Sequence, residues 1–357
     1  MEKRYLVLET GEVFEGVACG AEADTVGELV FTTGVVGYVE ALTDPCYYGQ
    51  ILMFTFPQLG NYGVMADDQD GRSCSVKGIV MREHCSIPSN FRCEGTLDDF
   101  LKKQGIPGIC GVDTRALTQI VRDHGVMNAV ITSAIPDGIP GSVKTYKITD
   151  SVPAVSADRK FVVPSDGETK YSVSMIDYGS KKNIISELTS RGCRVTVFPF
   201  NATAGEILAS NPDGIMLSNG PGDPSDNVQC IGTVKELLGK KPIFAVGLGH
   251  QIMALAAGAR TEKLKYGHRG SNQPVREKST GRIFITGQNH GYVVNTDSLA
   301  GTGAECSYEN ANDGTCEGIV YPGKNAFSLQ FHPETHSGPR ELEYAFDRFI
   351  SLMGGNK

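Results

Sequence analysis

The chain has 357 residues, of which 40% are hydrophobic and 21% charged, proportions that suit a globular protein with a buried core. At about 100–200 residues per domain, this length predicts two domains. The formal net charge of −8 gives no electrostatic support for binding to nucleic acid or to an anionic membrane. No apolar run approaches the roughly 20 residues that span a bilayer, and the N-terminus turns polar too soon for a signal peptide, so we expect a cytoplasmic protein.

Ten cysteines are scattered along the sequence. None of them forms a C-x-x-C pair, and none is spaced with histidines as in a zinc finger. A chain of this length does not need disulfide bonds for stability, so we expect reduced thiols. The spacing gives no reason to expect a bound metal.

Residues 1–145 read as a β-rich α/β domain. Strand-like alternation with β-branched residues occurs at 5–16, 28–34 and 50–57. The segment 96–105 predicts a helix with Thr96 as its N-cap and Gly105 as its C-cap. A second helix is expected at 113–125.

The segment 146–170 is polar, rich in Pro and Gly and weakly periodic, so we interpret it as a linker. Residues 171–357 then alternate strands with helices, which predicts a doubly wound, mostly parallel sheet. The fold class is therefore α/β. Sites in such sheets form where the strands end, and the unusual residues of this half follow strands.

The segment 242–259 runs from a strand through a sharp turn at Gly247 directly into a helix. This is the pattern of a nucleophile elbow, where glycines permit the turn and the helix N–H groups stabilise an oxyanion. A plain Gly-rich strand–helix turn is the alternative. A P-loop is excluded because the Lys-Ser/Thr pair is missing.

His332 and Glu334 follow the strand-like segment 325–331. Residues two apart project to the same side of an extended chain, so the carboxylate could orient the imidazole as a general base. Taken alone, such a pair is more often incidental.

Two further segments are typical of ligand contacts. Gly220 and Gly222, in the segment 218–224, allow the backbone to approach a ligand closely. Asn289, in the segment 288–294, offers a donor and an acceptor to an amino acid. The alternatives are an ordinary strand-to-loop turn and a hairpin turn.

In this order, the four segments resemble class I glutamine amidotransferases. Longer phrases are similar to the small subunits of carbamoyl phosphate synthetases: LSNGPGDP, LGHQIMALAAGA, YGHRGSNQP, ITGQNHGYVV and HPETHSGP. In the N-terminal half, residues 26–51 and 89–125 resemble the extra domain of those subunits. Amidotransferases of anthranilate or GMP synthesis lack that domain, so the resemblance is specific and covers almost the whole chain.

The resemblance implies that glutamine is hydrolysed by a Cys-His-Glu triad and that ammonia passes to a large subunit, which makes carbamoyl phosphate from bicarbonate and two ATP. His332 would be the base and Glu334 its orienting partner. No cofactor is expected on this chain, whereas ATP and Mg²⁺ are expected on the large subunit. The residues implied to hold glutamine, some through backbone atoms, are Cys46, Gly220, Gly222, Leu248, Gln251, Asn289, Gly291 and Tyr292.

The sequence departs from the family at two positions. Gly247 stands where the family has the nucleophilic cysteine, so no thioester can form there. Cys46 stands where the family usually has a serine that contacts glutamine. Cys46 is a possible substitute nucleophile, although it lies in the other predicted domain and has no assigned base.

Three interpretations remain open at this point. The chain is a glutaminase-type subunit with its hydrolysis disabled, or a subunit that is naturally ammonia-dependent and non-catalytic. A different class I amidotransferase or a γ-glutamyl hydrolase is the third, which the N-terminal domain disfavours. An engineered origin of Gly247 and a natural one both fit, and an arginine-linked and a pyrimidine-linked synthetase are equally compatible with the sequence.

Overall fold

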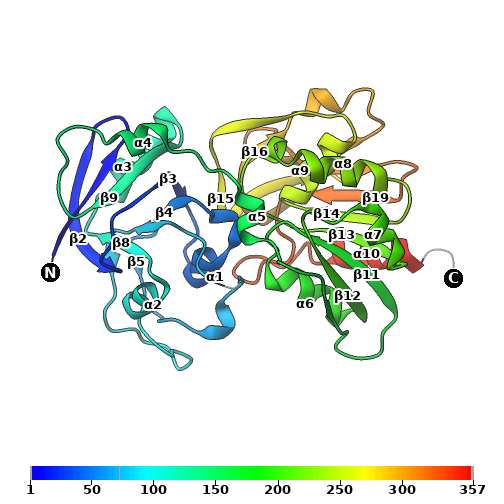
Figure 1. The fold of residues 1–357 in the computed structure, drawn as a ribbon, viewed down its shortest axis with the longest axis horizontal. Helices are drawn as coiled ribbons and strands as arrows, with labels where there is room; N and C mark the ends of the chain where they lie inside the picture. Colours follow the sequence, from blue (N-terminus) through cyan, green and yellow to red (C-terminus); the bar gives the residue numbers. More distant parts are fainter. Residues whose placement is uncertain (1, 72, 355–357) are drawn as a thin grey trace. The chain divides into compact units, whose positions relative to one another are not determined.

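The computed structural model describes residues 2–71 and 73–354. The chain divides into two compact units, Met1–Thr149 and Asp150–Lys357. In Figure 1 the first unit runs from blue to green-cyan and the second from green to red. Within the described ranges, we find no helix with the length and apolar character that crossing a lipid bilayer requires.

Seven strands of the first unit close into a barrel. Neighbouring strands follow the order β1-β2-β8-β6-β4-β3-β9. The barrel interior holds fully buried aliphatic residues such as Leu6, Leu29 and Ile51. The strands are β1 (Lys3–Leu8), β2 (Val13–Gly20), β3 (Thr25–Thr32), β4 (Gln50–Phe54), β6 (Gly78–Val80), β8 (Pro107–Cys110) and β9 (Met127–Thr132).

The two helices predicted in this unit are confirmed. Helix α2 (Leu97–Gln104) begins where the Thr96 hydroxyl accepts the Asp99 N–H at 3.1 Å, and it ends at Gly105 with φ 71°. Helix α3 is Thr114–His124. The remaining short elements are α1 (Tyr38–Thr43), η1 (Pro45–Tyr47), β5 (Gln58–Leu59), η2 (Ala66–Asp68), β7 (Glu83–His84) and α4 (Gly141–Thr145).

The second unit is built on a ten-stranded sheet in the order β10-β12-β11-β13-β14-β19-β18-β16-β15-β17. Strands β12, β11, β13, β14 and β19 run parallel, and the strands beyond β19 are antiparallel. This confirms the predicted doubly wound α/β fold. The strands are β10 (Phe161–Val163), β11 (Tyr171–Asp177), β12 (Cys193–Pro199), β13 (Gly214–Leu217), β14 (Ile243–Val246), β15 (Thr261–Glu277), β16 (Ile283–Val294), β17 (Glu305–Asn310), β18 (Cys316–Tyr321) and β19 (Ala326–Leu329).

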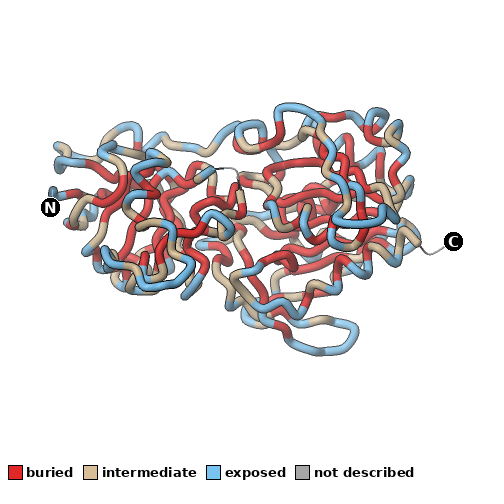
Figure 2. Tube along the Cα trace, turned by 90° about the horizontal axis from the view of Figure 1, so that it is seen from below, coloured by how far each residue is buried: buried red, intermediate tan, exposed pale blue. Residues whose placement is uncertain are grey.

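Helices cover both faces of the parallel strands because successive strand residues face opposite sides. Ile215 packs in one core with α7, α8 and α9, whereas its neighbour Met216 packs in another with α6 and α10. The helices are α5 (Ser151–Val155), α6 (Lys182–Ser190), α7 (Ala204–Ala209), η3 (Pro224–Asp226), α8 (Val228–Leu237), α9 (Leu248–Ala256), η4 (Thr296–Leu299) and α10 (Tyr344–Gly354). In Figure 2 the buried stretches, drawn in red, run through the interior of each unit, and the exposed stretches, in pale blue, lie mainly at its periphery.

The segment that we expected to be a linker, 146–170, carries regular structure. From Asp150 onward it belongs to the second unit and contains α5 and β10, and β10 pairs antiparallel with β12. A strand of three residues is too short to show periodicity, so its long-range pairing is not readable from local sequence.

Candidate active site

Gly247 forms a sharp turn between strand β14 and helix α9. Its backbone angles are φ 57° and ψ −116°, a conformation that glycine adopts freely and L side chains rarely adopt. The Gly247 N–H donates to the Leu329 carbonyl at 2.9 Å, which ties the turn to the neighbouring strand β19. The turn therefore has the geometry of a nucleophile elbow.

A side chain at position 247 would lie beside His332. A Cβ placed on Gly247 stands 3.5 Å from His332 Cε1 and 3.2 Å from Asn219 Cβ. Cε1 lies between the two ring nitrogens of His332, and one of them, Nδ1, is hydrogen-bonded to Glu334. A thiol on that Cβ would therefore be within reach of Nε2, the nitrogen that Glu334 leaves available.

His332 and Glu334 form a buried imidazole–carboxylate pair just beyond β19. His332 Nδ1 and Glu334 Oε1 are 2.7 Å apart, and the two side chains are 2% and 0% exposed. The His332 N–H donates to the Gly287 carbonyl at 2.9 Å, so β16 also holds the residue. The carboxylate accepts a hydrogen bond from the N–H at Nδ1. The other ring nitrogen, Nε2, therefore carries the lone pair and can take up a proton.

The carboxyl of Glu334 is held in its ionised form. Burial raises its pKa, but attraction to His332, the hydrogen bond with His332 and the Lys181 ammonium 3.8 Å away outweigh burial and bring the pKa below its ordinary value. Such a carboxylate can orient the imidazole and stabilise the imidazolium that forms when Nε2 takes a proton.

Lys181 is a site residue that the sequence analysis missed. Its side chain is 6% exposed, and its backbone N–H donates to Asn219 Oδ1 at 3.1 Å. The sequence signal that could have identified it is a lysine in the short connection between strand β11, which ends at Asp177, and helix α6, because β11 is the neighbour of β13 in the sheet.

The loop after β13 lies against the elbow. The Gly249 N–H donates to the Ser218 carbonyl at 3.0 Å. A Cβ on Gly220 would collide with the Tyr178 carbonyl oxygen and would lie 2.8 Å from Leu248 Cδ2. Only glycine permits this close approach, and it places the Gly220 backbone next to the start of α9, where the first helix N–H groups lack helical partners.

Gly222 lies at the far end of the same loop, with φ 88°. The loop is held there by the Ser151 hydroxyl, which donates to the Pro221 carbonyl at 3.2 Å. The structure therefore brings Gly220 and Leu248 together at the elbow, whereas the contacts of Gly222 are with Ser151.

Gln251 connects α9 to the antiparallel part of the sheet. Its Nε2 donates to the Tyr292 carbonyl at 2.7 Å and to Gln330 Oε1 at 2.8 Å. Asn289 and Gly291 precede Tyr292 on strand β16 and are half-buried. The segment 288–294 is therefore part of a strand, which excludes the hairpin turn that we considered as its alternative.

Cys46 belongs to the first unit, on the short helix η1, where its N–H donates to Asp44 Oδ1 at 2.9 Å. It is half-buried. None of the ten cysteines, all of which lie in the described ranges, forms a disulfide.

Two family profiles match the chain. The profile of the carbamoyl-phosphate synthase small chain, CPSase domain, matches residues 6–131, and that of class-I glutamine amidotransferases matches residues 174–352. A protein named carbamoyl phosphate synthase small chain, from Listeria monocytogenes, is 47% identical over 100% of this chain and 98% of its own length. The chain belongs to the carbamoyl phosphate synthase small chain family.

Another relative is the carbamoyl phosphate synthase pyrimidine-specific small chain of Halalkalibacterium halodurans, 46% identical over 99% of this chain and 98% of its own. Among solved structures, a glutamine amidotransferase from Thermotoga maritima aligns with a TM-score of 0.39 at 17% identity, covering 50% of this chain and 84% of that one. The match to the class-I amidotransferase profile spans Gly247, His332 and Glu334, whereas Cys46 falls in the match to the other profile.

Proposed function

We propose that this small chain binds glutamine for a carbamoyl phosphate synthetase and that it has lost the hydrolysis of glutamine through Gly247. The observation that carries the proposal is the position of His332. Its Cε1 lies 3.5 Å from a Cβ built on Gly247, and its Nδ1 is hydrogen-bonded to Glu334. The base and its carboxylate are in place beside a residue that has no nucleophilic atom.

The chemistry that a thiol at this position would perform follows from the neighbouring groups. The sulfur would attack the amide carbon of glutamine while His332 Nε2 takes the thiol proton. His332 would return that proton to the departing ammonia, and the N–H groups of Gly220 and Leu248 would stabilise the tetrahedral oxyanion. Water would then hydrolyse the thioester to glutamate. Without the thiol the first of these steps has no nucleophile.

Glutamine binding depends on groups that remain. We assign the amino-acid end of glutamine to Asn289 and to backbone atoms of Gly291 and Tyr292. Gln251 supports this assignment because it fixes the Tyr292 carbonyl through a 2.7 Å hydrogen bond. Cys46 would add a weak polar contact in place of the family's serine.

The partner that fits this function is the large synthetase subunit. Ammonia from glutamine must reach a second active site, and we assign ATP, Mg²⁺ and bicarbonate to that subunit. A stable heterodimer of this kind would bury more than about 1,200 Å². Gly247 also fits a second candidate, a naturally ammonia-dependent subunit that activates its partner without catalysis of its own, although the retained His332 and Glu334 favour the first.

The test is carbamoyl phosphate synthesis by the unaltered chain with its large subunit. We expect ammonia to support synthesis and glutamine to fail, while calorimetry still detects glutamine binding. Asn289→Ala should weaken that binding. Glutamine-dependent synthesis by the unaltered chain would overturn the assignment of Gly247, and its loss on Cys46→Ser would identify Cys46 as the nucleophile instead.

A further inference from the structure

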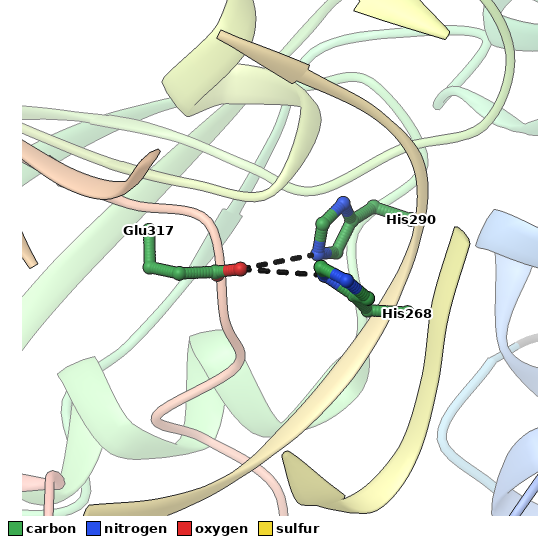
Figure 3. A group of neighbouring side chains, drawn as sticks. All are labelled: His268, His290 and Glu317. Atoms are coloured by element: carbon green, nitrogen blue, oxygen red, sulfur yellow. Dashed lines mark ion pairs between the residues drawn. The ribbon is translucent and has the colours of Figure 1, made fainter. Parts of the chain in front are cut away.

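Three buried side chains from three strands converge in the second unit. His268 lies on β15, His290 lies opposite it on β16, and Glu317 lies on β18. Their side chains are 10%, 5% and 0% exposed. In Figure 3 the carboxylate oxygen faces both imidazoles. We call these three residues the His–His–Glu cluster.

Each imidazole in the cluster is oriented through its other nitrogen. His268 Nε2 is 2.9 Å from Asp313 Oδ2, and His290 Nδ1 is 2.9 Å from the Tyr292 carbonyl oxygen. Both partners are acceptors, so those nitrogens carry the protons. With protons on those two nitrogens, His268 Nδ1 and His290 Nε2 present lone pairs to an ion, as metal-binding histidines do, and the ion would share His290 Nε2 with its present neighbour, Gln288 Oε1 at 3.0 Å.

The available nitrogens and the carboxylate lie at the spacing of ligands around one ion. Glu317 Oε1 is 3.4 Å from His268 Nδ1 and 3.8 Å from His290 Nε2. One ligand atom from each of the three residues lies within 4.8 Å of the other two. Bonds of about 2.0–2.1 Å to a tetrahedral Zn²⁺ place ligand atoms about 3.4 Å apart, so the 3.8 Å between Glu317 Oε1 and His290 Nε2 needs to close by about 0.4 Å.

Two buried polar atoms of the cluster lack full hydrogen bonding within the described part of the chain, and one of them, His268 Nδ1, faces Glu317 Oε1 at 3.4 Å. Among the described residues, His268 Nδ1 makes no hydrogen bond of good geometry, and neither does Glu317 Oε2. Leaving such atoms buried without partners costs stability, and an ion would satisfy them. The side-chain oxygen of Gln288, 3.0 Å from His290 Nε2, is also within reach of an ion at this position.

We propose that His268, His290 and Glu317 form a binding site for a divalent transition-metal ion of the zinc type. Two imidazoles and one carboxylate are a ligand set that Zn²⁺ accepts, and Asp313 is the outer carboxylate that raises the basicity of its histidine ligand. The charge also balances, because the ion together with Glu317 and Asp313 is neutral. The site links strands β15, β16 and β18, and none of its three ligands is assigned a step in glutamine hydrolysis, but His290 stands between Asn289 and Gly291 in the segment assigned to glutamine binding.

The test is titration of the chelator-treated full chain with Co²⁺ and then with Zn²⁺. We expect one equivalent of Co²⁺ to bind with the strong visible absorption of a four-coordinate ion, and Zn²⁺ to displace it. Glu317→Gln and His268→Gln should weaken Zn²⁺ binding at least about 100-fold, and Asp313→Asn should weaken it about 10–100-fold.

The matched control is a second, more exposed group of possible ligands, Glu187, His336 and Glu343. His336→Gln should leave the Co²⁺ spectrum and the Zn²⁺ affinity unchanged. Loss of the spectrum in His336→Gln with its retention in Glu317→Gln would overturn the proposal. Absence of four-coordinate Co²⁺ absorption in the unaltered chain would also overturn it, even if the cluster variants fail to fold.

Discussion

The second unit contains two groups of buried imidazoles and carboxylates, the His332–Glu334 pair and the His–His–Glu cluster. The two groups differ in how the ring nitrogens of the histidines face the carboxylates. His332 has Glu334 at Nδ1, and the Cε1 edge of its ring lies beside position 247. In the His–His–Glu cluster, the available nitrogens of two imidazoles face one carboxylate oxygen instead. The same residue types therefore make a proton-transfer site in one place and an ion-binding site in the other.

This difference in geometry distinguishes a general base from a metal ligand, which burial and charge alone do not distinguish. A general base needs one nitrogen fixed by a carboxylate and the other directed at a group that loses a proton. A metal site needs several lone pairs directed at one point. The predictions below test whether each group behaves according to its geometry.

The largest effect is expected from Gly247→Cys. Loss of a triad nucleophile can cost about 10⁶-fold in turnover, so restoring the thiol beside an intact base should recover a large part of that factor. Ammonia release from glutamine, measured with the large subunit present, reports the gain. Gly247→Ala, which adds a Cβ without a thiol, should show no gain.

The next effect separates the two groups directly. In the Gly247→Cys background, His332→Asn should reduce turnover by about 10²–10⁴-fold, because no base remains to take the thiol proton. Glu317→Gln in the same background removes a metal ligand and no proton-transfer group, so turnover should fall by less than about tenfold. Equal losses in the two double variants would contradict the distinction.

A smaller effect concerns strain at the elbow. A non-glycine residue at these backbone angles costs about 1–3 kcal/mol, and the lower entropy of its unfolded chain offsets about 0.4–1 kcal/mol. Gly247→Ala should therefore lower the free energy of unfolding by about 1–2 kcal/mol in urea titrations. Gly232→Ala, in the interior of α8 with no heavy atom within 4 Å of the new Cβ, is the control and should raise stability by about 0.5–1 kcal/mol.

The smallest effect is a change in pH dependence. The pKa of Glu334 is below its ordinary value in the folded chain, so the stability that this carboxylate contributes is present above its unfolded pKa and is lost as the pH falls. Between about pH 5 and about pH 3, the unfolding free energy of the unaltered chain should decrease more steeply than that of Glu334→Gln. Parallel curves for the two proteins would show that Glu334 is not held ionised by His332 and Lys181.

Much of the fold could be predicted because its signals are local. Thr96 and Gly105 mark the ends of α2, and the regular alternation of strands and helices from residue 171 predicts the parallel sheet. The closed barrel and strand β10 were not predicted, since both depend on pairing between segments far apart in sequence.

The two groups of imidazoles and carboxylates differ in the same way. His332 and Glu334 are two residues apart after a strand, so a sequence motif reveals them. The His–His–Glu cluster depends on the register of β15 and β16, which places His268 opposite His290 and shifts both before and after this pair. It also depends on the pairing of β18 with β16, which brings Glu317 to the two histidines. Motif rules based on the spacing of cysteine and histidine do not include strand register, which is why sequence analysis predicted no metal site. Lys181 was missed because a lysine after a strand is most often exposed.

The most direct test of the central claim is to locate the covalent intermediate. Gly247→Cys is mixed with glutamine, quenched in acid, digested and analysed by mass spectrometry. We predict a γ-glutamyl adduct on the peptide that contains position 247, and no adduct in the unaltered chain. An adduct on the peptide that contains Cys46, or ammonia release with no adduct at position 247, would contradict the assignment of this elbow as the nucleophile position.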